Sequence, residues 1–338
     1  MKKLKKILYV SVMIAVQSNA QDPNFSQFFS SPLNINPALT ANINADWRAI
    51  ANFRDQWIGP ASPYVTGTLS YDKKLFQKKI PNVEHYGNIF GVGGMLMYDR
   101  AMAGVVNSTY ASANVAYRVK LNNGETRHMF GAGFGAIYGH RRISFDRIDF
   151  EEQFTGYGFN TNLPTGETSL SRMKPYLSIS TGLLYSITSQ NSNIDIGVAA
   201  FHVNKPKQTF LKDENQELPI RKVAHVNYET FLSESVVLSV NAVYQSQETA
   251  NYYSFGGALG YYIPQMNDLM INAGLWYWSD NAVIPYVGLS YKDYQFGLSY
   301  DVTTSKLRQA NDKPNTYELS LIVRGRNKPS YVIPCPWK

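Results

Sequence analysis

The chain has 338 residues, of which 44% are hydrophobic and 17% charged, and it is rich in Tyr (24), Gly (24) and Phe (17). Its formal charge of +7 falls to +3 (28 Lys and Arg against 25 Asp and Glu) without the four lysines of the first six positions, which is too weak a balance to indicate nucleic-acid binding. The single cysteine, Cys335, excludes an intramolecular disulfide framework.

Residues 1–20 have the pattern of a secretory signal peptide. Four lysines precede a short apolar stretch at 7–16, and residues 18–20 (SNA) form a small-residue cleavage site that makes Gln21 the first mature residue. About ten apolar residues are too few to span a bilayer, so we reject a transmembrane anchor. The sequence therefore predicts export from the cytoplasm.

Residues 21–45 do not have the pattern of a strand. Pro23, Pro32 and Pro37 lie among apolar and aromatic positions, and proline lacks the amide that a sheet ladder needs. Exposing several large apolar side chains to water would forfeit roughly 2 kcal/mol each. We therefore predict an irregular segment packed in or against the mouth of a barrel, with these side chains buried: Phe25, Phe28, Phe29 and Leu33.

Residues 46–326 are dominated by segments in which apolar and polar residues alternate, as they do in strands with two different faces. In 294–303, for example, apolar residues occupy the even positions while Gln, Gly, Ser, Asp and Thr occupy the odd ones. The segments run for about ten residues, long enough to cross a membrane at a tilt, whereas strands of soluble sandwiches have about five or six. There are fourteen: 46–57, 63–72, 87–99, 104–119, 127–141, 175–189, 193–203, 221–232, 235–246, 251–262, 268–279, 282–291, 294–303 and 315–326.

The predicted fold is therefore all-β: a transmembrane antiparallel outer-membrane β-barrel of about fourteen strands whose lumen is not an open pore. Tyr and Trp gather towards segment ends, where we expect them to form rings at the two membrane interfaces. They stand at positions 57, 64, 71, 98, 117, 138, 276, 278, 286 and 291. Residues 327–338, with three prolines, are predicted to be a periplasmic tail. No role is predicted for Cys335.

Connection lengths predict an orientation. With both barrel termini in the periplasm, the long polar connections 142–174, 204–220 and 304–314 face the cell exterior, and the tight connections 190–192, 233–234 and 292–293 face inward. One connection breaks this rule: 73–86, with four lysines, would be a long basic periplasmic loop. Either that loop is functional or the strand count is wrong there.

Two sets of residues are candidates for a functional site. The polar face of the first strand would point into the lumen, as a hydrogen-bond network that fills the barrel or as a clamp for the N-terminal segment or a bound peptide. Its residues are Arg48, Asn52, Arg54 and Gln56. The first long exterior connection offers an aromatic cluster suited to partner binding, or the loop folds inward and closes the barrel. Its residues are Phe145, Phe150, Phe154, Tyr157 and Phe159.

The sequence offers little chemistry for catalysis. The five histidines are scattered without metal-ligand spacing, and no GxSxG, HExxH or GxxxxGK[ST] motif occurs. The glycine runs at 91–94 and 131–135 are not followed by a helix pattern, so we interpret them as small residues within strands. Glu151 and Glu152, near Asp146 and Asp149, could hold calcium, but a solvated loop is the preferred interpretation. We predict neither an enzyme nor a cofactor or metal site.

Several short runs resemble the PorP/SprF family of Bacteroidota. They are residues 22–27 (DPNFSQ), 36–38 (NPA), 52–57 (NFRDQW), 70–72 (SYD), 201–206 (FHVNKP), 297–301 (GLSYD) and 317–321 (YELSL). Many members carry a histidine before the last glutamate, where this chain has Tyr317. The resemblance implies an outer-membrane barrel attached to the type IX secretion system, which works with the secretion motor or retains one secreted protein, such as a gliding-motility adhesin, through its C-terminal domain.

Three functions are compatible with an exported barrel of this kind. The first is a barrel that binds and retains, or helps to export, a secreted protein, with contacts to other type IX components and to the bilayer. The second is a diffusion or uptake channel for small molecules, and the third an outer-membrane lipase or protease, for which a nucleophile–base motif is missing. Alternation cannot separate the first two, and the resemblance favours the first.

Overall fold

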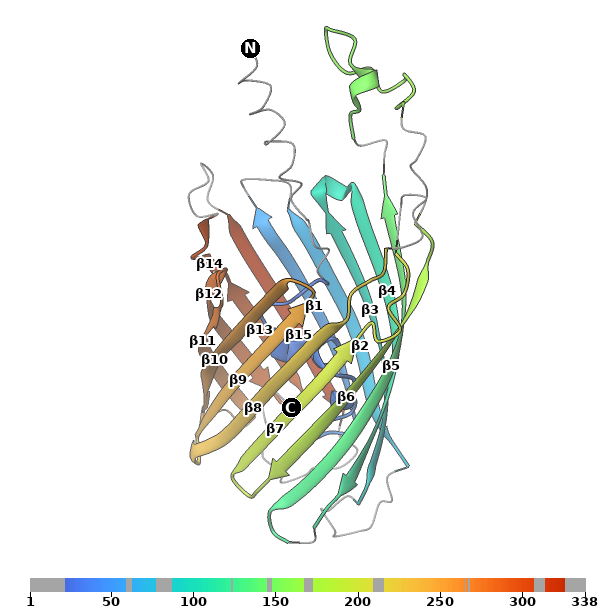
Figure 1. The fold of residues 1–338 in the computed structure, drawn as a ribbon. Helices are drawn as coiled ribbons and strands as arrows, with labels where there is room; N and C mark the ends of the chain where they lie inside the picture. Colours follow the sequence, from blue (N-terminus) through green and yellow to red (C-terminus); the bar gives the residue numbers. More distant parts are fainter. Residues whose placement is uncertain are drawn as a thin grey trace, which may run out of the picture.

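A computed structural model of the chain describes residues 22–58, 63–76, 87–122, 124–144, 148–166, 173–208, 216–264, 266, 268–306 and 314–325. The predicted signal peptide and the predicted tail, residues 327–338, lie outside the described residues. Figure 1 shows the described part as a tall ring of tilted strands.

The strands confirm the segments expected from alternation. Their bounds are β1 Trp47–Ile58, β2 Tyr64–Leu75, β3 Ile89–Ala101, β4 Val106–Lys120, β5 Arg127–Ile143, β6 Tyr176–Thr188, β7 Ser192–Phe201, β8 Arg221–Ser233, β9 Val236–Gln247, β10 Ala250–Tyr262, β11 Leu269–Trp278, β12 Ala282–Tyr291, β13 Tyr294–Tyr300, β14 Val302–Thr303 and β15 Asn315–Gly325. β13 and β14 both pair with β12 in one register, and only Asp301 interrupts them. They are two pieces of one strand, so the barrel has fourteen strands.

Each strand pairs antiparallel with its neighbour in sequence, and β1 pairs with β15 to close the ring. The closing register places Trp47 opposite Gly325 and Arg54 opposite Glu318. Closure matters in a membrane because every backbone donor and acceptor of the strands then finds a partner within the sheet. Among the described residues, no helix is long and apolar enough to cross a membrane.

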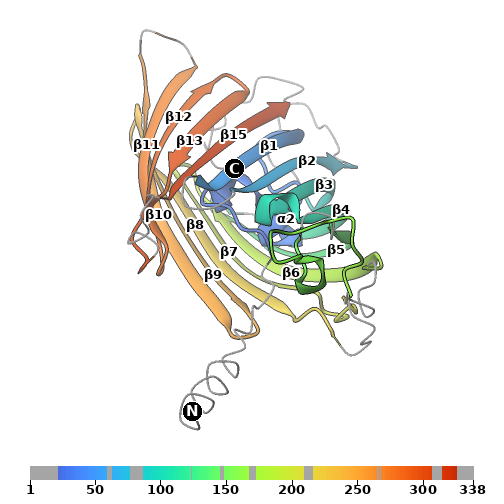
Figure 2. The ribbon, with the colours of Figure 1, turned by 90° about the horizontal axis from the view of Figure 1, so that it is seen from above.

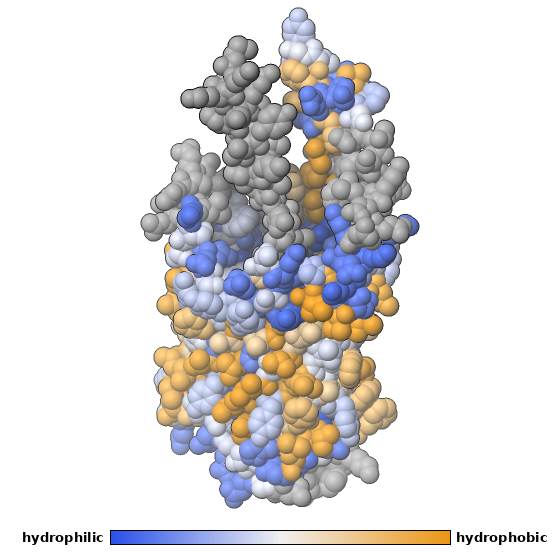
Figure 3. All heavy atoms as spheres, in the orientation of Figure 1, coloured by the Kyte–Doolittle hydropathy of each residue, from blue (hydrophilic) through white to orange (hydrophobic). Residues whose placement is uncertain are grey.

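The two faces of each strand differ as the alternation predicts. In β1, Phe53 is 45% exposed while its neighbours Asn52 and Arg54 are 4% and 1% exposed. The outer face is mostly apolar, and the inner face carries many buried polar and charged side chains, because lipid lies outside and the lumen inside. Figure 3 shows the resulting hydrophobic residues gathered over the strands, with hydrophilic residues towards both ends.

The expected rings of interfacial aromatics are only partly present. Tyr71, Tyr98, Tyr117, Tyr138 and Tyr291 are exposed on the outer face. Trp276, Trp278 and Tyr286 are instead buried, with exposed fractions of 1%, 9% and 2%. The prediction was wrong for these three because they stand at even-numbered positions, and the even-numbered positions of β11 and β12 face the lumen.

The two ends of the barrel carry different connections. We call the end after β1, β3, β5, β7, β9, β11 and β14 the long-loop end, because it carries 144–175, 202–220 and 304–314. The opposite end, the short-turn end, carries the tight turns 189–191, 234–235 and 292–293 together with the longer 76–88. The strand count therefore did not slip at 73–86. That the long-loop end faces the cell exterior stays a prediction.

Candidate functional site

The lumen of the barrel is occupied by the chain's own N-terminal residues. Residues 22–45, here called the lumen segment, contain η1 Phe28–Ser30, α2 Pro32–Ile35 and η2 Pro37–Leu39. Pro32 and Pro37 start their helical turns, a position where a missing amide hydrogen costs nothing. The side chains at 25–43 are buried, among them Phe25, Phe28, Phe29 and Leu33. Figure 2 shows α2 inside the ring of strands.

The segment begins at the long-loop end. Asp22 forms an ion pair there with Arg221 at 3.1 Å and a hydrogen bond with His202 at 2.7 Å. Its backbone nitrogen donates to the Gln247 side chain at 3.2 Å. Burial acts to raise the pKa of Asp22, but the charge of Arg221 and the hydrogen bond with His202 outweigh it and hold that pKa well below its usual value. Asp22 is therefore charged throughout the physiological range.

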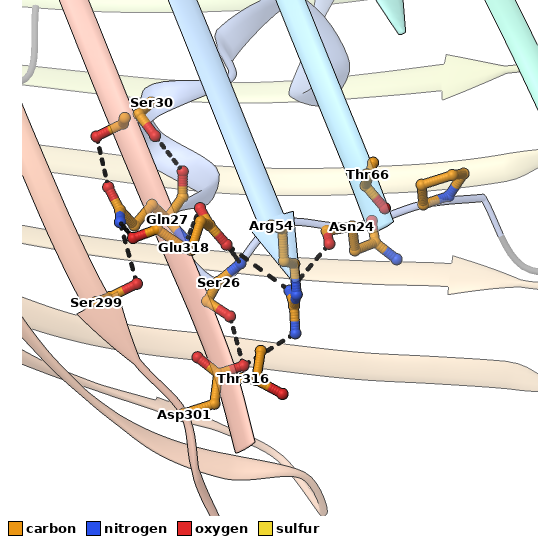
Figure 4. Close-up of polar contacts among 12 residues, drawn as sticks. Asn24, Ser26, Gln27, Ser30, Arg54, Thr66, Ser299, Asp301, Thr316 and Glu318 are labelled. Carbon is orange, nitrogen blue, oxygen red and sulfur yellow. Dashed lines mark hydrogen bonds and ion pairs between the residues drawn. The ribbon is translucent and has the colours of Figure 1, made fainter. Parts of the chain in front are cut away.

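In the half of the lumen nearer the long-loop end, the segment meets a charged cluster contributed by the closing strands β1 and β15 and by Asp301, between β13 and β14 (Figure 4). The carboxylate of Glu318 accepts hydrogen bonds from the backbone nitrogens of Ser26 at 2.7 Å and Gln27 at 2.9 Å. Arg54 pairs with Asp301 at 2.9 Å and donates to the Asn24 carbonyl at 3.0 Å. The Ser26 hydroxyl donates to Asp301 at 2.7 Å, which ties the segment to the point where β13 and β14 are interrupted.

The segment ends near the short-turn end. The backbone nitrogen of Ala41 donates to Asp72 at 2.7 Å, and Arg118 donates to the carbonyl of Ala41. Asp72 also pairs with Arg48 at 2.7 Å. The three anchors together show that the lumen segment runs from the long-loop end to the short-turn end, where β1 begins.

A diagonal row of glycines on the inner wall makes room for residues 36–41. A Cβ added at Gly91 would lie 2.7 Å from the carbonyl oxygen of Thr40 and 2.8 Å from the Cβ of Ala41, closer than real Cβ atoms approach. At Gly133 it would fall on the backbone of Ala38. At Gly182 and Gly197 it would lie 2.0 Å and 2.7 Å from the side-chain amide of Asn36. Glycine is needed here because the segment's main chain lies directly on the strands at Gly91 and Gly133, and the Asn36 side chain lies on them at Gly182 and Gly197.

Aromatic packing fills the opposite side of the lumen. Phe29 contacts Trp276 and Tyr286, with ring centroids 4.7 Å and 5.7 Å apart. These rings belong to one buried cluster with Phe28, Ile35 and Leu39 of the segment. A cavity of about 40 Å³ remains between the segment and β7–β9, which is room for about three water molecules.

The structure places the predicted lumen residues in two situations. Arg48, Asn52 and Arg54 are buried and in contact with the segment or its anchors, and Asn52 donates to the Ser30 carbonyl at 2.9 Å. Gln56 is only half-buried near the long-loop end. Sequence reasoning missed Glu318, Asp301 and Asp72. The signal was available for Glu318, because the first and last strands of a closed barrel are neighbours.

The predicted aromatic cluster lies outside the barrel. Residues 148–166, here called the arm, project beyond the long-loop end and carry a short turn, η5 Glu151–Gln153 (Figure 1). Phe154 and Phe159 pair with ring centroids 5.2 Å apart, and each is more than half exposed. Tyr157 at the tip is fully exposed and Phe150 half-buried, whereas Phe145 lies outside the described residues.

The arm is ordered by one buried side chain. Gln153, only 4% exposed, donates to the Leu163 carbonyl at 2.9 Å and accepts from the backbone nitrogen of Phe150 at 3.2 Å. The exposed aromatics thus belong to a segment that has its own internal hydrogen bonds. The described part of the chain contains no group of three or more His, Cys, Asp or Glu that could hold a metal, and this covers Glu151 and Glu152.

The closed antiparallel ring with an apolar exterior defines the class of the molecule, an outer-membrane β-barrel protein. A family model described as type IX secretion system membrane protein PorP/SprF matches residues 17–323. The chain therefore belongs to the PorP/SprF family, as the resemblance of its short runs predicted.

Solved structures share the fold at low identity. A mutant of the monoaromatic hydrocarbon channel TodX matches with a TM-score of 0.52 and 10% identity, covering 85% of this chain and 92% of that one. The toluene transporter TbuX of Ralstonia pickettii matches with a TM-score of 0.50 and 10% identity, covering 88% and 93%. At such identities the likeness shows the barrel fold alone. No curated protein matches the chain.

Proposed function

We propose that the protein is a partner-binding barrel of the type IX secretion machinery, which holds a secreted protein at the cell surface through that protein's C-terminal domain. A cell-surface or gliding adhesin is the expected kind of partner. The observation that carries this proposal is the lumen segment, because a barrel filled along its length by its own chain is suited to binding rather than to diffusion. The alternative, an uptake channel for small molecules, requires this segment to leave.

The arm is the proposed contact with the partner. Its exposed aromatics are the residue type that anchors interfaces, and the hydrogen bonds of Gln153 within the arm would lower the entropy lost on binding. Residues 148–166 contain Asp149, Glu151 and Glu152 and neither Lys nor Arg. The complementary surface on the partner is therefore apolar at its centre and basic at its rim. The other long connections at this end, 204–220 and 304–314, would extend the same surface.

Deletion of residues 147–170 tests this proposal. The barrel should still fold and insert, because the arm makes no strand pair with it, and the partner should be released into the medium. A finer variant replaces Phe154, Tyr157 and Phe159 with Ser. Losing an interface anchor costs roughly 2 kcal/mol or more, and this variant removes three of them, so binding should weaken by well over ~100-fold. The measurement is the amount of partner on intact cells against that in the medium.

The control keeps the arm and changes its polar surface. Thr161→Ser and Asn162→Ser alter exposed residues of the same arm and should leave the partner on the cells. The proposed contact is wrong if the partner stays attached after the deletion and the shortened barrel conducts ions instead. That result would mean that the connection folds inward and closes the barrel.

A further inference from the structure

The wall of the lumen recognises the main chain of the lumen segment. Glu318 accepts from two successive backbone nitrogens, those of Ser26 and Gln27. Arg54 and Asn52 donate to carbonyl oxygens, those of Asn24 at 3.0 Å and Ser30 at 2.9 Å. These contacts are made to groups that every polypeptide carries.

The same pattern continues along residues 34–41 of the segment. Arg221 donates to the Asn34 carbonyl at 3.1 Å. Asp72 accepts from the backbone nitrogen of Ala41, and Arg118 donates to its carbonyl. Six wall side chains thus bind backbone atoms between residues 24 and 41. Sites that bind peptides work in this way, with affinity from main-chain hydrogen bonds and selectivity from pockets for side chains.

The distribution of charge in the lumen limits which ligands the wall can bind. Residues 23–45 contain no charged side chain, and Asp22 is held separately by Arg221 and His202. The wall's own charges include the pairs Arg48–Asp72 and Arg54–Asp301. A ligand that brought an additional charge into this buried region would need a partner there or lose its hydration without compensation.

We propose that the lumen is a polypeptide-binding site and that residues 22–41 are its resident ligand. The site takes an uncharged segment rich in Phe and Pro, with one carboxylate at the long-loop end, through its main chain and the glycine row. Binding does not require the covalent link between the segment and β1, so the site also binds the same segment when it is supplied as a separate chain. This inference does not depend on the identity of any secreted partner.

The proposal is tested by supplying the chain from residue 21 onward as two separate pieces. Residues 46–338 are refolded in detergent with a fluorescently labelled synthetic peptide of residues 21–45. We expect saturable binding with one peptide per barrel, and no such binding by a peptide of the same composition in scrambled order. Gly133→Val should weaken binding by about tenfold or more, because its side chain would occupy the place of Ala38. Gly67→Val is the matched control, since an added Cβ there has only one neighbour, at 3.8 Å.

If the barrel piece folds only with the native peptide, the proposal is supported. If it folds and binds neither peptide, or binds both equally, the proposal is overturned. If it folds with neither, the covalent link is required and the site does not take a separate ligand.

A second measurement uses the unbroken chain. In the native protein, a protease should spare Phe28 and Phe29, whereas Gly133→Val should expose them to rapid cutting while Gly67→Val does not. Glu318→Gln, which keeps the side-chain volume but loses one carboxylate oxygen, should raise the cutting rate to an intermediate value. Protection that is unchanged in Gly133→Val contradicts recognition through the glycine row.

Discussion

Deleting residues 22–41 is expected to turn a closed barrel into a conducting one. The segment fills the lumen from Asp22 at the long-loop end to Ala41 at the short-turn end, and the wall behind it is lined by charged and polar side chains. Without the segment, water and ions enter this polar interior, as they do in channel-forming barrels. In planar bilayers we expect the ion conductance to rise by about tenfold or more over the intact protein.

The intact protein is the reference for this experiment, and it should show no large, steady current. Circular dichroism of the variant should show that the strands remain, since the segment forms none of them. An intact protein with steady porin-like conductance would contradict a closed lumen. A folded deletion variant that stays non-conducting would show that another part of the chain closes the barrel.

Replacing Arg54 with Met should cause a large loss of stability. Arg54 is 1% exposed and lies against Asp301 and Glu318, which are 3% and 0% exposed. Its removal leaves two buried carboxylates without this cation, and breaking a buried pair in this way costs about 3–5 kcal/mol. The same change releases the Asn24 carbonyl, so the lumen segment should loosen as well. The measurement is the free energy of unfolding in detergent, from urea titration.

Arg100→Met provides the comparison. Arg100 is exposed on β3 and its guanidinium donates to the nearby Ala103 carbonyl at 3.3 Å, so its replacement should change the unfolding free energy by less than about 0.5 kcal/mol. Equal losses in the two variants would show that the cluster of Arg54, Asp301 and Glu318 does not hold the closing strands and the segment together.

The strands were predictable because the membrane imposes a local rule. Each strand has lipid on one face and the lumen on the other, so alternation in ten residues is enough to place it, as in β13 and β14. The same rule would have placed Trp276 inside the barrel, had parity been preferred to the general tendency of Trp to lie at interfaces.

The route of the lumen segment was not predictable in the same way. Prolines and apolar side chains indicate that it is buried, but its path depends on contacts such as that between Ser26 and Glu318, which lie 292 positions apart. Likewise, Gly91 and Gly133 look like ordinary small strand residues until the main chain of Thr40 and Ala38 is placed against them. These features depend on the register of distant strands, which no local pattern encodes.

The most direct test of a partner-binding barrel is a pull-down of the intact protein from native membranes in mild detergent, with the co-purifying proteins identified by mass spectrometry. The account predicts a secreted protein in near-stoichiometric amount, retained by its C-terminal domain and absent when residues 147–170 are deleted. A barrel that purifies alone from native membranes and conducts small molecules when reconstituted would contradict it and favour the channel.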